Sequence, residues 1–398
     1  MILIIVFCLF TFIIFYTYLG YGILIWFLVK IKEIFKPRSK NKLQDVELLD
    51  VTLLIAAYNE ENVVVEKMDN IESLNYPKEK LHVVWVTDGS TDSTVEMLKS
   101  YPNIKVLHKP EREGKTAAIN RSMSQINTPI VIFTDANAIL NTQSINEIVS
   151  LFADSKVGCV TGEKRVNIES KDNASSSGEG FYWRYESVLK SLDSRLYSVV
   201  GAAGELFAIR RDLFEYIPND TILDDFVLSL KIAQKGYRIA YCSEAYAMEY
   251  SSDSMIEEEK RKVRIAAGGL QAVWRLRPLL NIFRYGLLSF QYISHRMLRW
   301  TITPLALFAL LPLNVLLCIQ TYPTCTLPAI LLILQVIFYL LGFVGYTLAK
   351  KEIKNKVLFI PYYFLFMNLN VIKAYFYLKK RSNSGIWEKV KRKSTQNS

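Results

Sequence analysis

Cysteine and histidine are scarce in this chain of 398 residues, which holds five of the first and three of the second. Neither a Cys-x-x-Cys pair nor a His-Glu-x-x-His arrangement occurs. These absences argue against a zinc site. Low-complexity tracts are also missing, and 51% of the residues are hydrophobic. An intrinsically disordered chain is therefore excluded.

Charged side chains are missing from two long stretches, residues 1–29 and 301–349. Both exceed the roughly 20 residues that cross a bilayer. The first stretch is too long for the apolar region of a signal peptide, and no small-x-small cleavage site follows it. We therefore expect an uncleaved N-terminal anchor. The candidate C-terminal spans are 301–320, 327–349 and 357–378.

The net charge of +10 comes mainly from two short segments. Residues 30–42 hold six basic side chains and one acidic one, and residues 379–398 hold seven basic and one acidic. Such clusters beside membrane spans are typical of the cytoplasmic side. Nucleic acid is not an expected partner, because the middle of the chain has no basic stripe beyond residues 260–277. Three full C-terminal crossings would put the basic tail outside, so either 357–378 is re-entrant or the tail is an exception.

The middle of the chain alternates apolar runs typical of buried strands with helical patterns. The strands are expected at Val51–Ala57, Leu81–Val86, Ile104–Leu107 and Ile130–Phe133. This alternation predicts an α/β fold with a mostly parallel sheet and helices on both faces. In such sheets, ligands bind at the carboxyl ends of the strands.

We therefore expect six segments in a multi-pass protein of the cytoplasmic or inner membrane, with the α/β middle domain on the cytoplasmic side. The segments are an anchor at 1–29, a basic linker at 30–50, the α/β domain at 51–277, an interfacial helix at 278–300, transmembrane segments at 301–378 and a basic tail at 379–398.

Polar side chains follow three of the expected strands. Asn59 follows the first strand, Asp88 the second, and Asp135 and Asn137 the fourth. Asp88 can accept hydrogen bonds from a nucleobase or ribose. The oxygens of Asp135 and Asn137 suit a hard cation such as Mg²⁺ or Mn²⁺ that bridges phosphates. One such residue alone is more often a turn or a helix cap, but three strand ends in order favour a nucleotide site.

Two further groups carry charge or small residues. Gly114-Lys115-Thr116 is not a P-loop, because Lys109 stands where that motif needs a glycine, yet Lys115 can meet a diphosphate as a point charge or lie in solvent. Asp224 and Asp225 precede a helical pattern, where they act as caps or as a general base and its supporting acid. Gly204 lies in a small-residue segment that forms a plain turn or lets backbone approach a substrate.

An ordered set of motifs resembles glycosyltransferase family 2, in its membrane-integrated branch of cellulose, chitin, hyaluronan and poly-N-acetylglucosamine synthases. The set covers about residues 51–277, and its single motifs are short. They are Ile55-Ala56-Ala57-Tyr58-Asn59-Glu60, Val86-Thr87-Asp88-Gly89-Ser90, Gly114-Lys115, Thr134-Asp135-Ala136-Asn137 and Asp224-Asp225.

The resemblance implies a GT-A fold and a nucleotide-diphosphate sugar as donor. The nucleotide-sugar residues would be Ala57, Tyr58, Asn59, Glu60, Asp88, Lys115 and Asp135. Asp135, with Asn137, would hold a divalent cation, Mg²⁺ or Mn²⁺, that neutralises the diphosphate. Asp225 would be the catalytic base. Asp224, Gly204, Arg261 and Arg264 would support the acceptor side.

Two departures from the family pattern stand out. The metal motif is Asp-x-Asn rather than Asp-x-Asp, so one carboxylate is lost. The Gln-x-x-Arg-Trp motif of processive synthases is matched at residues 261–265 only by Arg264. A similar run at Arg296–Trp300 lies beside a membrane span, and we interpret it as interface anchors. The missing Trp favours limited transfer over processive synthesis.

The sequence thus predicts a metal-dependent, inverting membrane glycosyltransferase whose acceptor is a growing polysaccharide or a lipid-linked sugar. Export or regulatory subunits are possible partners besides the bilayer. The alternatives are a membrane transporter that senses nucleotides and an inactive scaffold of a polysaccharide-export complex. The absence of a Walker motif opposes the first alternative, and the retained Asp88, Asp135 and Asp225 oppose the second.

Overall fold

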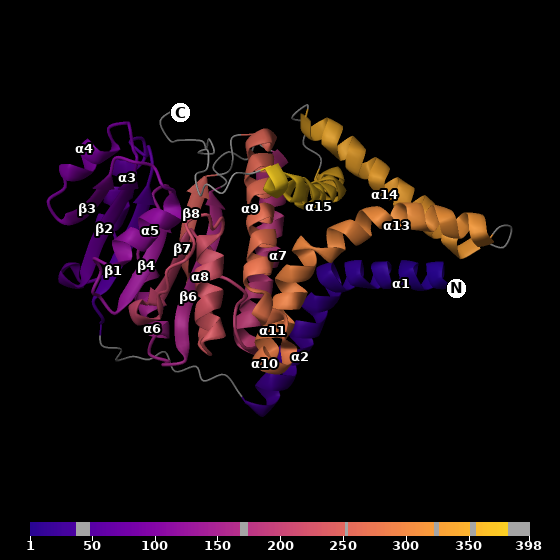
Figure 1. The fold of residues 1–398 in the computed structure, drawn as a ribbon, viewed down its shortest axis with the longest axis horizontal. Coiled ribbons are helices and arrows are strands. Elements are labelled where there is room, and N and C mark those ends of the chain that lie inside the picture. Colours follow the sequence, from indigo (N-terminus) through magenta and orange to yellow (C-terminus); the bar gives the residue numbers. More distant parts are fainter. Residues whose placement is uncertain (37–47, 168–173, 251–253, 322–325, 351–355, 381–398) are drawn as a thin grey trace.

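The computed structural model describes residues 1–36, 48–167, 174–250, 254–321, 326–350 and 356–380. Figure 1 shows three layers: a twisted sheet with short helices on one side of the molecule, a row of long helices beside it, and apolar helices that project away from the sheet. The expected basic tail at 379–398 lies almost wholly outside the described residues.

The sheet is mixed and mostly parallel, with the strand order β3-β2-β1-β4-β7-β6-β8-β5. The first four strands in this order run parallel, β6 runs parallel to β8, and β7 and β5 run against their neighbours. The expected α/β fold with a mostly parallel sheet is confirmed, and three of the strand pairs are antiparallel. The strands are β1 Val51–Ala57, β2 Leu81–Asp88, β3 Ile104–Lys109, β4 Ile130–Asp135, β5 Ile139–Leu140, β6 Val157–Asn167, β7 Leu206–Arg210 and β8 Arg238–Tyr250.

Both faces of the sheet are buried, which explains why β1 is a continuous apolar run. Leu53 and Ile55 pack on one face, which is covered by α3 (Val64–Glu72), α4 (Thr94–Lys99) and α6 (Ser144–Leu151). Leu54 packs on the other face, which is covered by α5 (Lys115–Met123) and α8 (Asp224–Gln234).

Two long helices, α7 (Ala174–Leu196) and α9 (Met255–Arg275), separate the sheet from the apolar helices (Figure 1). The sequence patterns did not predict α7. Its residues Leu189, Leu192 and Leu196 pack against Tyr21, Ile25 and Val29 of α2. The N-terminal helix therefore contacts the α/β unit directly.

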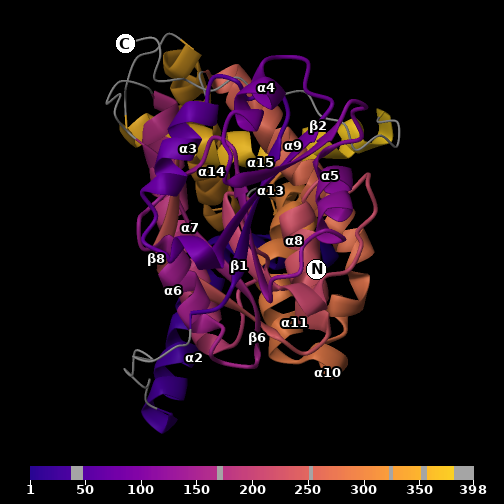
Figure 2. The ribbon, with the colours of Figure 1, turned by 90° about the vertical axis from the view of Figure 1, so that its left-hand side faces the viewer.

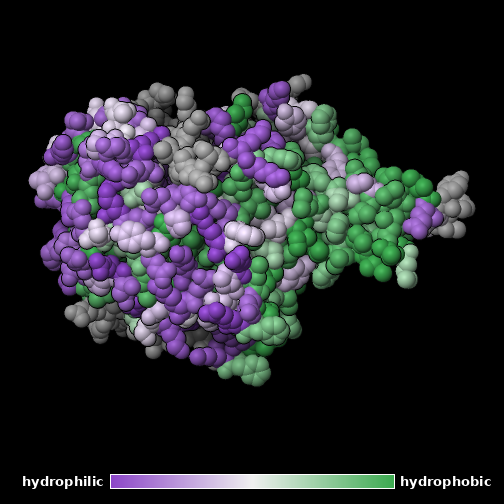
Figure 3. Space-filling model, in the orientation of Figure 1, coloured by the Kyte–Doolittle hydropathy of each residue, from purple (hydrophilic) through white to green (hydrophobic). Residues whose placement is uncertain are grey.

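Four helical stretches of the described chain are long and apolar enough to cross a membrane. Figure 3 shows a hydrophobic surface where these helices project and a hydrophilic one over the sheet. They are α1 (Ile2–Phe15) continued through a π-helical turn at Tyr16–Gly20 into α2 (Tyr21–Phe35), then α13 (Ile302–Thr321), α14 (Thr326–Lys350) and α15 (Lys356–Lys380).

The helix α15 packs against α14 but points in a different direction from α13 and α14. It is seen nearly end-on in Figure 1 and lies across the molecule in Figure 2. Its closest neighbours besides α14 are α9 and α7. Lys373 of α15 pairs with Glu259 of α9 at 2.6 Å, which joins α15 to a helix of the α/β unit.

The expected single helix at 278–300 is wrong. Two local features cut it: the Asn281 side chain accepts the N–H groups of Phe283 and Arg284, and Gly286 adopts a left-handed φ of 52°. An N-cap begins a new helix, and a left-handed residue ends one. The segments are a 3-10 turn at Arg277–Leu280, α10 (Ile282–Tyr285), α11 (Leu287–Tyr292), a π-helical turn at Ile293–Met297 and α12 (Leu298–Trp300).

Candidate active site

The predicted nucleotide residues meet at one edge of the sheet. Ala57 ends β1, Asp88 ends β2 and Asp135 ends β4. Because β2, β1 and β4 are adjacent and parallel, their carboxyl ends share one edge. The topology therefore brings together residues that lie up to about 80 positions apart in the sequence.

Asn59 organises the loop after β1. It has a left-handed φ of 53°, a conformation that asparagine tolerates better than most residues. Its side-chain oxygen accepts the Thr91 N–H at 2.8 Å, and its own N–H donates to Ser90 Oγ at 3.1 Å. The neighbouring Glu60 N–H donates to Thr94 Oγ1 at 2.8 Å. The loops after β1 and β2 are thus held together.

Tyr58 stacks beneath a cation. The Arg112 guanidinium lies 3.6 Å from the centre of the Tyr58 ring. Such a pair presents a flat, positively charged surface, which suits a base or a phosphate.

Asp88 is buried and connects β2 with the start of α5. Its Oδ2 accepts the N–H groups of Glu113 at 2.9 Å and Gly114 at 2.6 Å. Its Oδ1 lies 3.7 Å from a nitrogen of Arg121, and no group in the described part of the chain hydrogen-bonds it. One oxygen of Asp88 therefore positions the loop before Lys115, and the other keeps its capacity to accept a hydrogen bond.

Lys115, Asp135, Gly204 and Asp225 converge on one place. The Lys115 ammonium pairs with Asp135 Oδ1 at 2.7 Å. A Cβ atom on Gly204 would lie 3.4 Å from Asp225 Oδ2 and 3.8 Å from Lys115 Nζ. The lysine thus belongs to the same pocket as the acids, and Gly204 leaves space beside the Asp225 carboxyl.

The two acids at the start of α8 differ in their surroundings. Asp224 is buried, and its Oδ2 has no hydrogen-bond partner among the described residues. Asp225 is half-buried. Burial and the neighbouring Asp224 raise the pKa of Asp225 to about 7, against the opposing effect of Lys115. A carboxyl group with a pKa near neutrality is suited to accept a proton.

Lys115 remains a cation in this pocket. Burial alone would lower its pKa, but the carboxylates of Asp135, Asp224 and Asp225 raise it above the ordinary lysine value. A charged ammonium beside three acids lowers the cost of keeping them ionised, and it offers a positive charge to an incoming phosphate.

A metal site made by protein groups alone is not seen in the part of the chain that the structure describes, where no three His, Cys, Asp or Glu side chains cluster. Asp135 and Asn137 supply one carboxylate and one amide oxygen, both half-buried. Mg²⁺ commonly takes one or two carboxylates together with substrate phosphates and water. The donor set therefore fits a cation that binds with a diphosphate.

Lys67 is a residue of this region that the sequence patterns did not single out. Its fully buried ammonium donates to Ala138 O and, at 3.3 Å, to Thr134 Oγ1. It thereby holds the turn that carries Asp135 and Asn137. The available signal was a lysine at a position of α3 that shares its face with Val64, Met68 and Ile71.

The two arginines predicted on the acceptor side lie on α9. Arg261 is buried and donates to both oxygens of Glu258, at 3.0 and 3.2 Å. Arg264 lies three residues further along and is half-buried. Arg261 is thus engaged in an ion pair within its own helix.

The interpretation of Arg296–Trp300 as interface anchors is wrong. Arg296 and Arg299 both pair with Glu186 of α7, the second at 3.2 Å. The Trp300 ring meets the Phe226 ring edge to face, with centroids 5.1 Å apart. These side chains point into the protein because their buried acidic partner lies on a helix that sequence patterns did not reveal. Trp300 supports the residue that follows Asp225.

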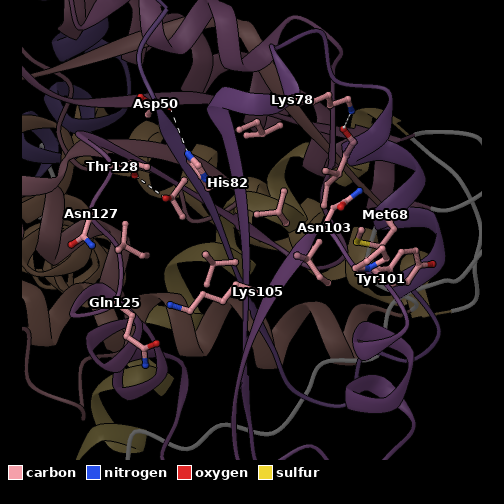
Figure 4. A pocket seen from close by; sticks show the side chains of 18 of the residues that line it. Asp50, Met68, Lys78, His82, Tyr101, Asn103, Lys105, Gln125, Asn127 and Thr128 are labelled. Carbon is pink, nitrogen blue, oxygen red and sulfur yellow. Dashed lines mark hydrogen bonds and ion pairs between the residues drawn. The ribbon is translucent and has the colours of Figure 1, made fainter.

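A hollow of about 920 Å³ lies at the opposite ends of β1, β2 and β3, where Thr52, His82 and Thr128 line it (Figure 4). It contains none of the predicted site residues. The hollow is therefore separate from the pocket around Asp225.

Comparison with known proteins agrees with this arrangement. The profile of the family described as "Glycosyltransferase like family 2" matches residues 50–268. A poly-beta-1,6-N-acetyl-D-glucosamine synthase of Staphylococcus aureus (strain MSSA476) is 28% identical over 252 residues, covering 60% of this chain and 59% of the relative. A probable glycosyltransferase of Bacillus subtilis (strain 168), YdaM, is 25% identical over 260 residues, again 60% of this chain and 59% of the relative.

The fold also matches a solved structure, a mannosyltransferase from Pyrobaculum calidifontis in complex with GDP-Man and Mn²⁺. The TM-score is 0.69 at 24% sequence identity, and the match covers 95% of this chain and 99% of that one. This likeness confirms the expected GT-A-like fold, and the family profile spans more than half of the sequence. The chain belongs to the glycosyltransferase 2-like family.

Proposed function

We propose that this glycosyltransferase moves a sugar, with inversion, from a nucleotide-diphosphate sugar to a growing polysaccharide or a lipid-linked acceptor at the membrane. The observation that carries the proposal is the Asp225 carboxyl, with its pKa raised to about 7, in one pocket with Lys115 and Asp135. A proton acceptor and a phosphate-binding cation in one pocket are what such a transfer requires.

The donor site would lie at the ends of β1, β2 and β4. Asp88 Oδ1 would accept a hydrogen bond from the nucleoside, and Ala57, Tyr58, Asn59 and Glu60 would line the same pocket. The unused hydrogen-bonding capacity of Asp88 Oδ1 supports this placement. The mannosyltransferase with the matching fold was solved with GDP-Man, a donor of the class proposed here.

A divalent cation, Mg²⁺ or Mn²⁺, would be held by Asp135 and Asn137 together with the diphosphate. When bound, it would neutralise charge on the departing diphosphate. Lys115 would contribute a second positive charge at the same place. The 2.7 Å contact between its ammonium and Asp135 supports this placement.

In the reaction itself, Asp225 would accept the proton of the acceptor hydroxyl as the oxygen bonds to the sugar carbon. The bond from that carbon to the diphosphate breaks on the opposite face, which inverts the configuration. The space beside Gly204 would admit the acceptor. Asp224 would keep the pKa of Asp225 high enough for it to act as a base near neutral pH.

The alternatives of a nucleotide-sensing transporter and an inactive scaffold are less well supported. Neither requires a carboxyl group poised to accept a proton beside a lysine and a candidate cation-binding pair. The poly-N-acetylglucosamine synthase relative supports polysaccharide acceptors. The Arg296–Trp300 run packs inside the protein with Trp300 against Phe226, so a missing Trp no longer favours limited transfer over polymer synthesis.

The proposal is tested by incubating membranes that contain the protein with a panel of radiolabelled UDP- and GDP-sugars and sizing the products. We expect label from at least one donor to enter a lipid-extractable or polymeric product. Nucleotide release without any labelled product would favour the transporter, and a complete lack of donor consumption would favour the scaffold.

A further inference from the structure

Three lysines surround one tryptophan between the sheet and the long helices. The ammonium of Lys164 on β6 lies 5.3 Å from the centre of the Trp183 ring, that of Lys262 on α9 lies 5.8 Å from it, and that of Lys190 on α7 lies 5.9 Å from it. All three lysines are at most 4% exposed. Three elements thus bring cations to one aromatic ring inside the protein.

The three ammonium groups differ in their partners. Lys164 pairs with Glu205 and Glu249, and Lys262 lies 3.4 Å from Glu258. For Lys190, the described residues provide neither an ion pair nor a hydrogen bond, only the Trp183 ring. A buried charge without a partner is costly, so proteins normally pair such groups or use them to bind a ligand.

This cluster adjoins the pocket of Asp225. Glu205, the partner of Lys164, directly follows Gly204 in the sequence. Gly204 in turn faces the Asp225 carboxyl and the Lys115 ammonium. Lys190 is thus linked to the proposed base through Trp183, Lys164 and Glu205. Burial lowers the pKa of Lys190, and the charges of Glu186, Glu205 and Asp225 oppose this shift while that of Arg296 adds to it.

From this geometry we propose that Lys190 and Trp183 form a subsite for an anionic group on the acceptor. A phosphate on a lipid or a carboxylate on an acidic sugar would supply the charge that Lys190 lacks, and the Trp183 ring would contact the adjoining sugar or apolar part. The inference rests on the proposed function, because it names the acceptor class of that same site. It sets Lys190 apart from Lys164 and Lys262, whose ammonium groups already lie beside carboxylates.

The test is a binding titration of the full chain in detergent with three probes of equal alkyl length: dodecyl phosphate, dodecyl glucuronide and dodecyl glucoside. We expect one or both anionic probes to bind more tightly than the neutral glucoside. Lys190→Gln should weaken that anionic binding about ten-fold and leave glucoside binding unchanged. Preference for the phosphate identifies a lipid phosphate as the source, and preference for the glucuronide identifies an acidic sugar.

The matched control is Lys99→Gln, which removes an exposed lysine of α4 and should change no affinity. Thermal unfolding separates this role from a purely structural one. Loss of a structural lysine would lower Tm, whereas loss of a buried cation without a partner should not, so we expect Lys190→Gln to keep or raise the Tm of the protein. Equal affinity for all three probes, or an unchanged anion affinity in Lys190→Gln, would overturn the inference. Because probe binding is measured without a sugar donor, its result does not depend on whether the protein transfers sugar. A failure of this inference can therefore be told apart from a failure of the proposed function.

Discussion

At the scale of single residues, the active pocket depends on a balance of four charges. Asp224 raises the pKa of Asp225, while Lys115 lowers it and also pairs with Asp135. Each of these four residues could be predicted as a site residue from the sequence, because each stands in a short motif at a strand or helix end. The sequence could not reveal the bond between Lys115 and Asp135, because that contact depends on the neighbouring positions of α5 and β4.

The pH dependence of transfer follows from this balance. The proposed base, Asp225, can accept a proton only when it is ionised, so kcat/KM should rise with pH up to about 7 and then level off. Asp224→Asn removes a like charge and should move the midpoint to lower pH. Lys115→Met removes the opposing cation and should move it to higher pH. Profiles of kcat/KM against pH for the unaltered protein and the two variants check the direction of each shift. The same midpoint in all three would contradict the assignment of Asp225 as the base.

The proposed role of Asp135 in cation binding gives a second prediction. Asp135→Ala removes the only carboxylate of the Asp-x-Asn pair, so we expect loss of transfer and weaker Mn²⁺-dependent donor binding. Asn146→Ala, at a half-buried position of α6 outside the proposed site, serves as the control and should bind the donor as the unaltered protein does. Near-normal turnover of Asp135→Ala in excess EDTA would rule out the metal role.

At the scale of elements, the strands were easier to predict than the helices near the membrane. The strand Val51–Ala57 is buried on both faces, and its continuous apolar composition predicts this burial. The helix α7 carries no comparable pattern, because its inward face holds Glu186, Lys190 and Asp193 as well as leucines. Missing α7 led to the wrong interpretation of Arg296–Trp300, whose charged partner is Glu186.

The contact of Trp300 with Phe226 predicts a positioning role. Trp300→Ala leaves a gap beside the residue next to Asp225, so kcat should fall while donor affinity stays within about two-fold, and stability should fall by about 1–3 kcal/mol. Trp274→Ala is a matched control, because Trp274 is 72% exposed. Kinetics and thermal unfolding check both. If the two variants have the same kcat and the same stability, Trp300 does not position Asp225 and is better explained as a membrane-interface anchor.

At the scale of the whole molecule, the arrangement of helices leads us to propose a membrane topology. If α1, α13 and α14 cross the bilayer and α15 lies along its surface, the basic tail is on the same side as the α/β unit, as the positive-inside tendency requires. The bond between Lys373 and Glu259 supports this placement. The sequence alone could not decide whether α15 crosses the membrane, because α15 is as long as a spanning helix.

Cysteine labelling tests this topology. In a background without native cysteines, Thr321→Cys at the end of α13 should react with a membrane-impermeant maleimide in intact cells. Lys380→Cys at the end of α15 should react only after lysis. Labelling of Lys380→Cys without lysis would show that α15 crosses the membrane.

The proposed catalysis is tested most directly by comparing Asp225→Asn with Asp224→Asn. Both changes keep size and remove one carboxylate, so each serves as the control for the other. We expect Asp225→Asn to bind the nucleotide-sugar donor normally but to lose transfer by about 10² to 10⁴-fold, while Asp224→Asn keeps measurable transfer. If Asp224→Asn is the inactive variant and Asp225→Asn still transfers sugar, Asp225 is not the base.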